Sequence, residues 1–544
     1  MLKMNKSTLR AAIPALLLSA LVLMPFFNKA FTVDDPVFLF EARHVLVDPF
    51  HPTAFEMTWA DMSERVSRLV PTGPVMAWLL VPTLLAHGAE WVAHATQLAM
   101  LWLAILATVS LARRFELQKP WPAASGLILV AMPAVLGMAG TAMPDVPAMA
   151  LGVAGIERLV AWRQNRRVSQ ALLAAVFLGL APLTRPHTIL LLGVGAILLL
   201  GPTFSLTGLR NRYLTFLPLV AAPLITVAVS FITRDPHPGA GSMVGSAIRY
   251  SSVSISRLAT NFVALPIHWV LVMAFGLPWL ALRWRTILQT RMLLVVASAS
   301  ALISAIALTY IGRQSLPLSI ISGLGCAVLW DVLADGWKRR DSVQLALGLW
   351  LLIALPTVLY AHLPAKYLIV SAPAAALLIA RELALRNGKA SWIILVATVA
   401  IGIGLGVAIL RADAVFANLG RRAANELIAP NVVAGKHVWF VGHWGFQWYA
   451  ENAGARPVTL NPPYPLPGDL IVVSIASCRS DELLKMMSSL YPRITQVSRL
   501  EDSRSGGRLM NKKLGAGFYS TVSGYWPWGW GDTLIDQFTL WRVE

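Results

Sequence analysis

The sequence predicts a polytopic α-helical membrane protein with about thirteen transmembrane helices and a C-terminal α/β domain. Three observations support this fold class: the composition, the spacing of the apolar segments and the alternating charge of the connections between them. Of the 544 residues, 56% are hydrophobic and only 13% are charged, whereas about 25% of the residues in a soluble domain are charged. This composition is typical of an integral membrane protein.

Apolar stretches of about 17–25 residues are long enough to cross a bilayer as helices. Thirteen such stretches occur before residue 412, and we expect each to be a transmembrane helix. They cover residues 11–31, 92–112, 121–141, 146–162, 170–184, 188–204, 213–232, 262–282, 292–312, 316–334, 343–361, 367–385 and 391–411. The predicted transmembrane domain therefore comprises residues 1–411.

Basic residues gather in every second connection between these stretches. In chain order the clusters are Lys3/Lys6/Arg10, Arg113/Arg114/Lys119, Arg163/Arg166/Arg167, Arg210/Arg212, Arg283/Arg285/Arg291, Lys338/Arg339/Arg340 and Arg381/Arg386/Lys389. The positive-inside rule places these connections and the N-terminus in the cytoplasm, so thirteen spans put the C-terminus outside. The net charge of +18 then needs no nucleic-acid partner.

Two large segments are expected on the outer side of the membrane. Residues 32–75 form an acidic first loop, in which Phe38–Val47 predicts a helix lying along the membrane interface. Residues 412–544 predict a soluble α/β domain, because buried strands alternate with helices. The strands are expected at His437–Val441 and Asp469–Val473, and the helices at Gln447–Asn452 and Asp481–Leu490. A further outer loop, residues 234–261, is rich in Gly and Ser and is expected to be mobile or ordered by substrate.

An acidic doublet, Asp34 and Asp35, follows the first span. Carboxylates at the edge of a bilayer are costly to desolvate, so they usually have a function or a close partner. In a structural interpretation Asp35 caps a helix whose first residue is Pro36, which leaves Asp34 unexplained. In a functional interpretation the doublet supplies a general base that deprotonates an acceptor hydroxyl or amine. The residues alone do not decide between the two interpretations.

Three outer-side cations, Arg185, Arg313 and Lys366, depart from the positive-inside trend. Phosphate is their natural partner, because arginine is a forked donor and lysine a point charge. The alternative is that long side chains extend from the bilayer into water, but three cations on a cation-poor side favour anion binding. Asp145 opens the fourth span on the same side and either caps that helix or helps to hold a substrate hydroxyl or a metal.

The order and spacing of these short motifs resemble the GT-C superfamily of polyprenyl-phosphate-sugar glycosyltransferases, in particular its protein O-mannosyltransferase and lipid A aminoarabinose transferase branch. The motifs are Asp34-Asp35, Met143-Pro144-Asp145-Val146-Pro147, Leu183-Thr184-Arg185-Pro186, and Lys366-Tyr367-Leu368 followed by Ser371-Ala372-Pro373. The resemblance covers roughly residues 10–410. It implies an inverting sugar transfer from a polyprenyl-phosphate donor to a lipid, glycan or protein acceptor. It also implies a multi-pass protein of the bacterial inner membrane with a periplasmic C-terminal domain.

Carried over by position, the resemblance implies that Asp34 or Asp35 is the catalytic base and that Asp145 helps to shape the site. Arg185 and Lys366 would contact the donor phosphate, and Tyr367 and Arg313 are further candidate substrate-binding residues. The second acid is often Glu in the family, whereas here it is Asp35 followed by a proline, which leaves the acceptor open. The sequence contains no convincing metal-ligand cluster, so no metal site is assigned and a divalent cation is left open.

A polytopic transporter or flippase of a lipid-linked or anionic substrate is the alternative function. It would explain the many spans, but not an outer domain of about 130 residues, and the internal repeats common in transporters are not evident. A membrane sensor is a third possibility, for which no cytoplasmic output module is evident. Aromatic residues of the last domain gather at Trp439, His443–Tyr449 and Tyr525–Trp530. They either stack on sugars, form an interfacial belt or pack in a core, and packing or a belt is favoured.

Overall fold

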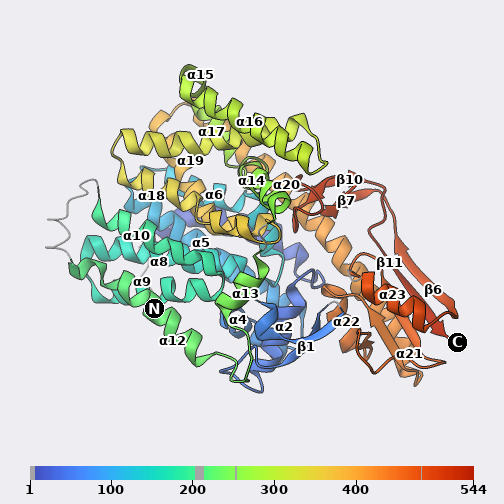
Figure 1. The fold of residues 1–544 in the computed structure, drawn as a ribbon. Coiled ribbons are helices and arrows are strands. Elements are labelled where there is room, and N and C mark those ends of the chain that lie inside the picture. The colour runs from blue at the N-terminus through green and yellow to red at the C-terminus, as the bar shows by residue number, and fades with distance from the viewer. Residues whose placement is uncertain (1–5, 60, 71, 202–212, 252–253, 479–480) are drawn as a thin grey trace.

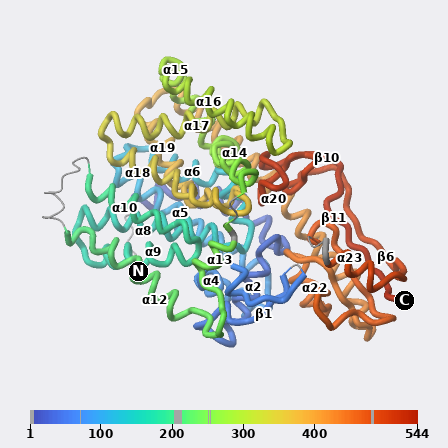
Figure 2. The backbone as a smooth tube through the Cα atoms, in the orientation of Figure 1, coloured from blue at the N-terminus to red at the C-terminus, as the bar shows by residue number. Residues whose placement is uncertain are grey.

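The computed structural model describes residues 6–59, 61–70, 72–201, 213–251, 254–478 and 481–544. A bundle of long helices occupies most of the molecule, and a sheet-containing domain lies beyond one end of the bundle (Figures 1 and 2). The domain is formed by the last part of the chain, shown in orange and red. The prediction of a predominantly helical membrane protein with a sheet-containing C-terminal region is confirmed.

Each of the thirteen apolar stretches falls on a helix or a pair of helices. Within the described ranges, eight segments are long and apolar enough to span a membrane: Lys6–Phe26, Glu90–Arg114, Tyr213–Ile232, Arg291–Tyr310, Leu316–Lys338, Ser342–Leu359, Ala365–Arg386 and Lys389–Val433. Their main helices are α1 (Lys6–Leu23), α5 (Glu90–Arg114), α12 (Leu217–Ile232), α16 (Arg291–Tyr310), α17 (Leu316–Lys338), α18 (Ser342–Leu351), α19 (Ala372–Arg386) and α20 (Lys389–Ala423).

Of the remaining five stretches, two are bent, two fall on shorter helices and one, on the helix Asp145–Asn165, is long but is not among the eight. Two of them are helix pairs, α6 (Trp121–Val130) with α7 (Pro133–Ala139), bent by 61°, and α14 (Ile255–Leu271) with α15 (Gly276–Gln289), bent by 85°. The other three fall on α8 (Asp145–Asn165), α9 (Val168–Leu180) and α10 (Leu191–Leu200). The predicted spans thus correspond to helices or helix pairs, and two of them are bent.

The break between α6 and α7 has a local cause and a consequence for the site. Pro133 has no backbone N–H and disfavours helical backbone at Met132, which is extended (φ −71°, ψ 119°). α7 then ends after only two turns, and the following turn, which includes Thr141, Ala142 and Met143, is fully buried. This buried turn receives one member of the acidic doublet, as described below.

Contacts between connections that are far apart in the sequence show which of them lie together. At one end of the bundle the first outer loop reaches the 234–261 segment through a two-pronged ion pair of Arg65 with Asp235 at 2.7 and 2.8 Å. At the same end Arg313 donates to the Thr521 carbonyl in the C-terminal domain at 2.6 Å. The basic connections lie at the other end, except that Lys3, Arg210 and Arg212 fall outside the described residues.

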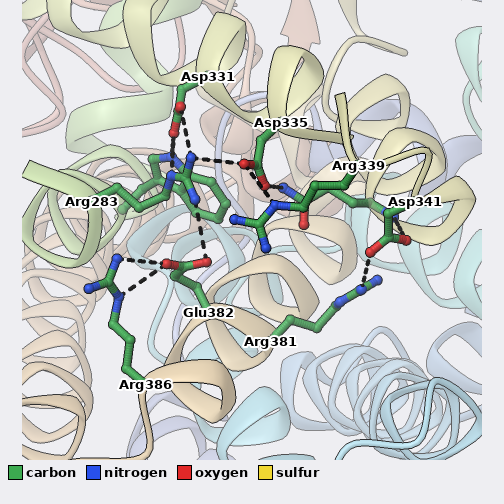
Figure 3. A network of polar contacts seen from close by, with 10 residues as sticks. Arg283, Asp331, Asp335, Arg339, Asp341, Arg381, Glu382 and Arg386 are labelled. Atoms are coloured by element: carbon green, nitrogen blue, oxygen red, sulfur yellow. Dashed lines mark hydrogen bonds and ion pairs between the residues drawn. The ribbon is translucent and has the colours of Figure 1, made fainter. Parts of the chain in front are cut away.

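A network of ion pairs joins α15, α17 and α19 at this basic end (Figure 3). Its centre is Arg283, which donates to Asp331 at 2.6 Å and to Asp335 at 3.1 Å and lies 3.8 Å from Glu382. The whole network contains four arginines, Arg283, Arg339, Arg381 and Arg386, and four carboxylates, Asp331, Asp335, Asp341 and Glu382. The charges in this part of the basic end are therefore balanced.

The C-terminal domain contains a mixed five-stranded sheet in the order β4-β3-β5-β11-β6. β3 (Val438–Val441) runs parallel to β4 (Arg456–Pro457) and β5 (Leu470–Ser474), whereas β11 (Asp536–Val543) is antiparallel to β5 and to β6 (Ile494–Asp502). The expected strands and helices are present as β3, β5, α22 (Gly445–Asn452) and α23 (Asp481–Leu490). The predicted α/β pattern is correct, and the β6–β11 pair completes the sheet.

One outer segment differs from the sequence-based expectation, and a second contains helices. The predicted interfacial helix is present as α2 (Asp35–Val45), but it begins three residues earlier and is largely buried against α4 (Val75–Leu85) and α22. The Gly- and Ser-rich segment 234–261 is not simply irregular, because it contains α13 (Met243–Tyr250) and the first turns of α14. The side chain of Ser242 caps α13 by accepting a hydrogen bond from Gly245 N.

Candidate active site

The two aspartates of the doublet lie in different surroundings. The chain turns sharply just before them at Val33, which has a positive φ of 38°, an unfavourable conformation for a β-branched residue. Asp35 is fully buried, and its two carboxylate oxygens accept hydrogen bonds from Thr32 N and Ala142 N, each at 2.8 Å. The Asp34 side chain, in contrast, is 36% exposed. Only Asp34 is therefore accessible to a ligand.

Asp34 forms an ion pair with a lysine that is distant in the sequence. Its Oδ2 accepts from Lys366 Nζ at 2.6 Å, and the lysine lies in the turn that leads into α19. Burial alone would raise the pKa of Asp34, but the Lys366 ammonium, with the more distant Arg185, holds the pKa below its ordinary value. Asp34 is consequently ionised at neutral pH in this structure.

Asp35 joins two buried segments instead of facing the cavity. Burial raises the pKa of Asp35 to about 7, against the opposing effects of Lys29 and of the two backbone N–H donors. Lys29 itself pairs with Asp413 of α20 at 2.7 Å, and Asp413 also accepts from the Thr32 hydroxyl at 3.1 Å. These bonds fix the first outer loop to the α7–α8 turn and to the last long helix.

Arg185 and Asp145 form a second buried ion pair. The guanidinium donates through Nε and Nη2 to the two carboxylate oxygens of Asp145, at 2.8 and 2.7 Å. The Asp145 side chain is fully buried, and the guanidinium carbon of Arg185 lies 5.2 Å from the centre of the Tyr367 ring. Because a bidentate pair fixes both the position and the plane of the guanidinium, Asp145 orients Arg185.

A cavity of about 240 Å³ connects these groups. One carboxylate and two cations line it, namely Asp34, Lys366 and Arg185. The aromatic and imidazole side chains on its wall are Phe38, Trp59, Tyr360, His362, Tyr367, His443 and Trp444. The cavity therefore combines a potential base, two potential anion ligands and aromatic surfaces in one enclosed space.

The structure brings together four of the seven residues predicted from the sequence. Asp34, Arg185, Lys366 and Tyr367 line the cavity, whereas Asp35 and Asp145 are buried behind its wall. Arg313 is not one of the lining residues: it donates to the carbonyl groups of Thr521 and Val522, and its guanidinium lies over the Tyr525 ring. Arg313 thus connects the bundle to the C-terminal domain in this structure.

Sequence reasoning did not predict that the C-terminal domain contributes to the cavity. His443 and Trp444 are buried, as the packing interpretation expects, but they also form part of the cavity wall. Trp444 has φ 60° and ψ −154°, and Gly442 has φ 136°. An unusual backbone of this kind is often found at functional sites. The Gly442-His443-Trp444-Gly445 sequence, with a glycine on each side, was the available signal.

In the part of the chain that the structure describes, no group of three or more His, Cys, Asp or Glu side chains is placed to hold a metal ion.

Comparison with solved structures finds several membrane-bound transferases. One is ArnT from Cupriavidus metallidurans bound to undecaprenyl phosphate, at 16% identity, with 89% of this chain and 96% of that chain covered and a TM-score of 0.48. Another is the archaeal oligosaccharyltransferase AglB from Archaeoglobus fulgidus, at 12% identity, 84% and 64% coverage and a TM-score of 0.43. A third is the arabinofuranosyltransferase AftD from Mycobacteria, at 14% identity, 99% and 40% coverage and a TM-score of 0.40.

These three structures belong to the GT-C superfamily, which the sequence motifs also resemble. No protein-family model and no curated protein matches the chain. Because the identities are at most 16% and the TM-scores lie below 0.5, the activity has to be inferred from the site.

Proposed function

We propose that this protein is an inverting glycosyltransferase that moves a sugar from a polyprenyl-phosphate donor to an acceptor hydroxyl or amine. The observation that carries the proposal is the cavity that holds one accessible carboxylate together with two cations. Displacement at an anomeric carbon needs a base for the acceptor and charge stabilisation for the departing phosphate. The lipid-linked donor follows from the motif resemblance and from a site at the end of a membrane-spanning bundle.

Asp34 is the base in this proposal. It lines the cavity and is ionised, whereas both carboxylate oxygens of Asp35 already accept backbone hydrogen bonds. The acceptor oxygen or nitrogen attacks the anomeric carbon as its proton passes to Asp34. The bond between that carbon and the phosphate oxygen breaks, and its electron pair leaves with the phosphate. A single displacement of this kind inverts the anomeric configuration.

Lys366 and Arg185 stabilise the departing phosphate. Lys366 is bound to Asp34 in this structure, so a donor phosphate competes with this carboxylate for the ammonium group. Transfer of Lys366 to the phosphate removes the partner that lowers the pKa of Asp34, so the pKa rises. Asp34 then becomes a stronger base only when the donor is present. Arg185, held by Asp145, supplies a second fixed charge.

The orientation in the membrane follows from the charge of the two ends. The cavity lies at the end of the bundle opposite the basic connections, which are expected in the cytoplasm. We therefore place the cavity and the C-terminal domain on the periplasmic side of a bacterial inner membrane. The aromatic wall formed by Trp59 and Trp444 offers surfaces on which a sugar ring can stack.

The test measures release of polyprenyl phosphate from a panel of radiolabelled polyprenyl-phosphate sugars, with a membrane extract as the acceptor source. Asp34→Asn should lower the rate about 100-fold or more, which is the contribution expected of a general base. Asp48→Asn is a matched control, because Asp48 lies in the same outer loop and its side chain is 38% exposed, but it lies outside the cavity.

Two results would contradict the proposal. If Asp34→Asn turns over donor at a rate within about tenfold of the wild type, Asp34 is not the base. If proteoliposomes move the intact lipid-linked sugar across the bilayer without breaking the sugar–phosphate bond, the protein is a flippase. In that case Asp34→Asn and Asp48→Asn should be measured again for transport.

A further inference from the structure

A second, larger cavity of about 490 Å³ lies at the basic end of the bundle. α8 links the two cavities, because it begins at Asp145 behind the candidate active site and ends at Asn165 beside this second cavity. At 1.5 Å per residue the two ends of α8 are roughly 30 Å apart. The second cavity is therefore not part of the candidate active site.

Three helices that lie side by side, α5, α8 and α9 (Figure 1), supply most of the residues that line this cavity. α5 and α9 both pack against α8. The lining residues of α5 are Leu103, Leu106, Ala107, Ser110, Arg113 and Arg114. Their spacing of three and four residues places them on one helix face. Along about 16 Å of this face the lining changes from apolar to basic.

The polar half of the cavity has more positive than negative charge. Its lining contains four arginines, Arg113, Arg114, Arg158 and Arg167, but only two carboxylates, Glu116 and Glu157. The charge-balanced network in Figure 3 lies at the same end of the bundle, and there four arginines meet four carboxylates. An excess of positive charge is thus a property of this cavity and not of every ion-pair cluster at this end.

Two of the four arginines are paired with Glu157, whose single negative charge offsets only one of them. Its carboxylate, which is almost fully buried, pairs with Arg114 Nε at 2.6 Å and with Arg158, and it also accepts from the Ser110 hydroxyl at 2.7 Å. Arg113 instead donates to the neutral hydroxyl groups of Ser7 and Thr8. The exposed Arg167 has no hydrogen-bonded or ion-paired side-chain partner within the described residues. Arg113 and Arg167 are therefore available to an anion.

The neighbouring surface of the bundle is apolar. On α9, Val168 and Leu172 are 66% and 62% exposed, and Trp102 on α5 is 39% exposed. In a membrane such side chains face acyl chains. A molecule that enters this cavity therefore meets an apolar wall formed by Leu103, Leu106 and Phe177 and a basic end formed by the arginines.

We propose that this cavity binds one anionic phospholipid of the surrounding leaflet. Arg113 and Arg167 contact the negatively charged head group, because guanidinium groups are forked donors to phosphate oxygens. The first part of the acyl chains lies along the apolar wall. Basic pockets between transmembrane helices are known to recognise anionic head groups. The amphipathic lining favours a lipid over a soluble anion, which would leave the apolar half unfilled.

The test is native mass spectrometry of the full chain, purified in mild detergent and titrated with phosphatidylglycerol or phosphatidylcholine of the same acyl chains. The wild type should bind the anionic lipid at least tenfold more tightly than the zwitterionic lipid. Arg113→Gln/Arg167→Gln should remove at least tenfold of this preference. Arg285→Gln/Arg291→Gln is the matched control. Both arginines belong to another basic connection and are exposed, but neither lines the cavity.

Several outcomes would overturn the proposal. Equal binding of the two lipids, or equal loss of preference in the cavity variant and in the control variant, would mean that no specific head-group site exists. Displacement of the lipid by millimolar inorganic phosphate would mean that the cavity selects a soluble anion. If the double variant fails to fold, Arg167→Gln alone is tested, because this side chain is exposed. Arg167→Gln should still lower the preference for the anionic lipid at least threefold.

Discussion

The buried pair of Asp145 and Arg185 makes a prediction that separates stability from activity. Asp145→Asn leaves Arg185 without a counter-charge, and Arg185→Met leaves Asp145 without one. Breaking a buried ion pair in this way costs about 3–5 kcal/mol. The two costs should be unequal: the Asp145 side chain is fully buried, whereas Arg185 lines the cavity and its side chain is 8% exposed. Water in the cavity can hydrate the arginine but cannot reach the aspartate.

We therefore expect Asp145→Asn to lower the free energy of unfolding by about 3 kcal/mol and Arg185→Met by about 5 kcal/mol. The double variant Asp145→Leu/Arg185→Met should lie within about 1–2 kcal/mol of the wild type, because apolar side chains can replace a buried ion pair at little cost. The measurement is reversible unfolding in mixed detergent micelles, with tryptophan fluorescence as the signal. Sugar transfer by the same three proteins is measured in parallel.

The double variant separates the role of the ion pair in stability from the role of Arg185 in activity. It should be stable but inactive, because it keeps the packing and loses the cation that meets the donor phosphate. A double variant whose loss equals the sum of the two single losses would show that the charges do not neutralise one another. A stable and active double variant would refute the role proposed for Arg185, while the structural account of the pair would stand.

Two further predictions concern Lys366 and a close helix contact. Lys366→Gln should move the acid limb of the pH profile of kcat/KM to higher pH, because the largest charge that opposes the effect of burial on the pKa of Asp34 is removed and the base is protonated at a higher pH. Lys366→Arg should restore the limb, and an unmoved limb in Lys366→Gln would refute the pairing. Gly402→Ala should destabilise the bundle by about 1–3 kcal/mol in a thermal or detergent unfolding assay, because the added Cβ would collide with the Ala131 carbonyl oxygen. Gly404→Ala is the control, since no atom lies within 4 Å of the Cβ that it adds. Equal losses of stability in the two variants would contradict the contact.

Much of the architecture could be predicted because its signals are local. The length of an apolar stretch decides whether it can span a bilayer, and the charge of a connection indicates its side of the membrane. The bends between helices were harder to predict from the sequence. Pro133 marks the break after α6, but the 85° angle between α14 and α15 depends on how neighbouring helices pack around it. The β6–β11 pair was missed because β6, although nine residues long, is largely exposed and has no alternating apolar pattern.

The candidate site was predicted in part, because short motifs identify residue types but not their partners. Asp34 and Lys366 were both candidates, but they lie 332 residues apart in the sequence. Nothing in the sequence near either residue indicates that their side chains form a hydrogen bond. Arg313 was assigned to the site for its charge, and the structure gives it carbonyl partners in the C-terminal domain instead. Trp444 was expected to pack, and it does so at the cavity wall.

By itself the sequence determined the membrane class, the order of the apolar segments, the α/β character of the last domain and a set of candidate acids and cations. These properties follow from hydrophobicity and charge, which each segment possesses independently of the others. Only the tertiary structure decided which aspartate is accessible, which cation each carboxylate meets and where the C-terminal domain closes the cavity. The reason is that burial and ion pairing depend on distances between segments far apart in the chain, so Asp34 and Asp35 can be neighbours in sequence and still differ in exposure and in pKa.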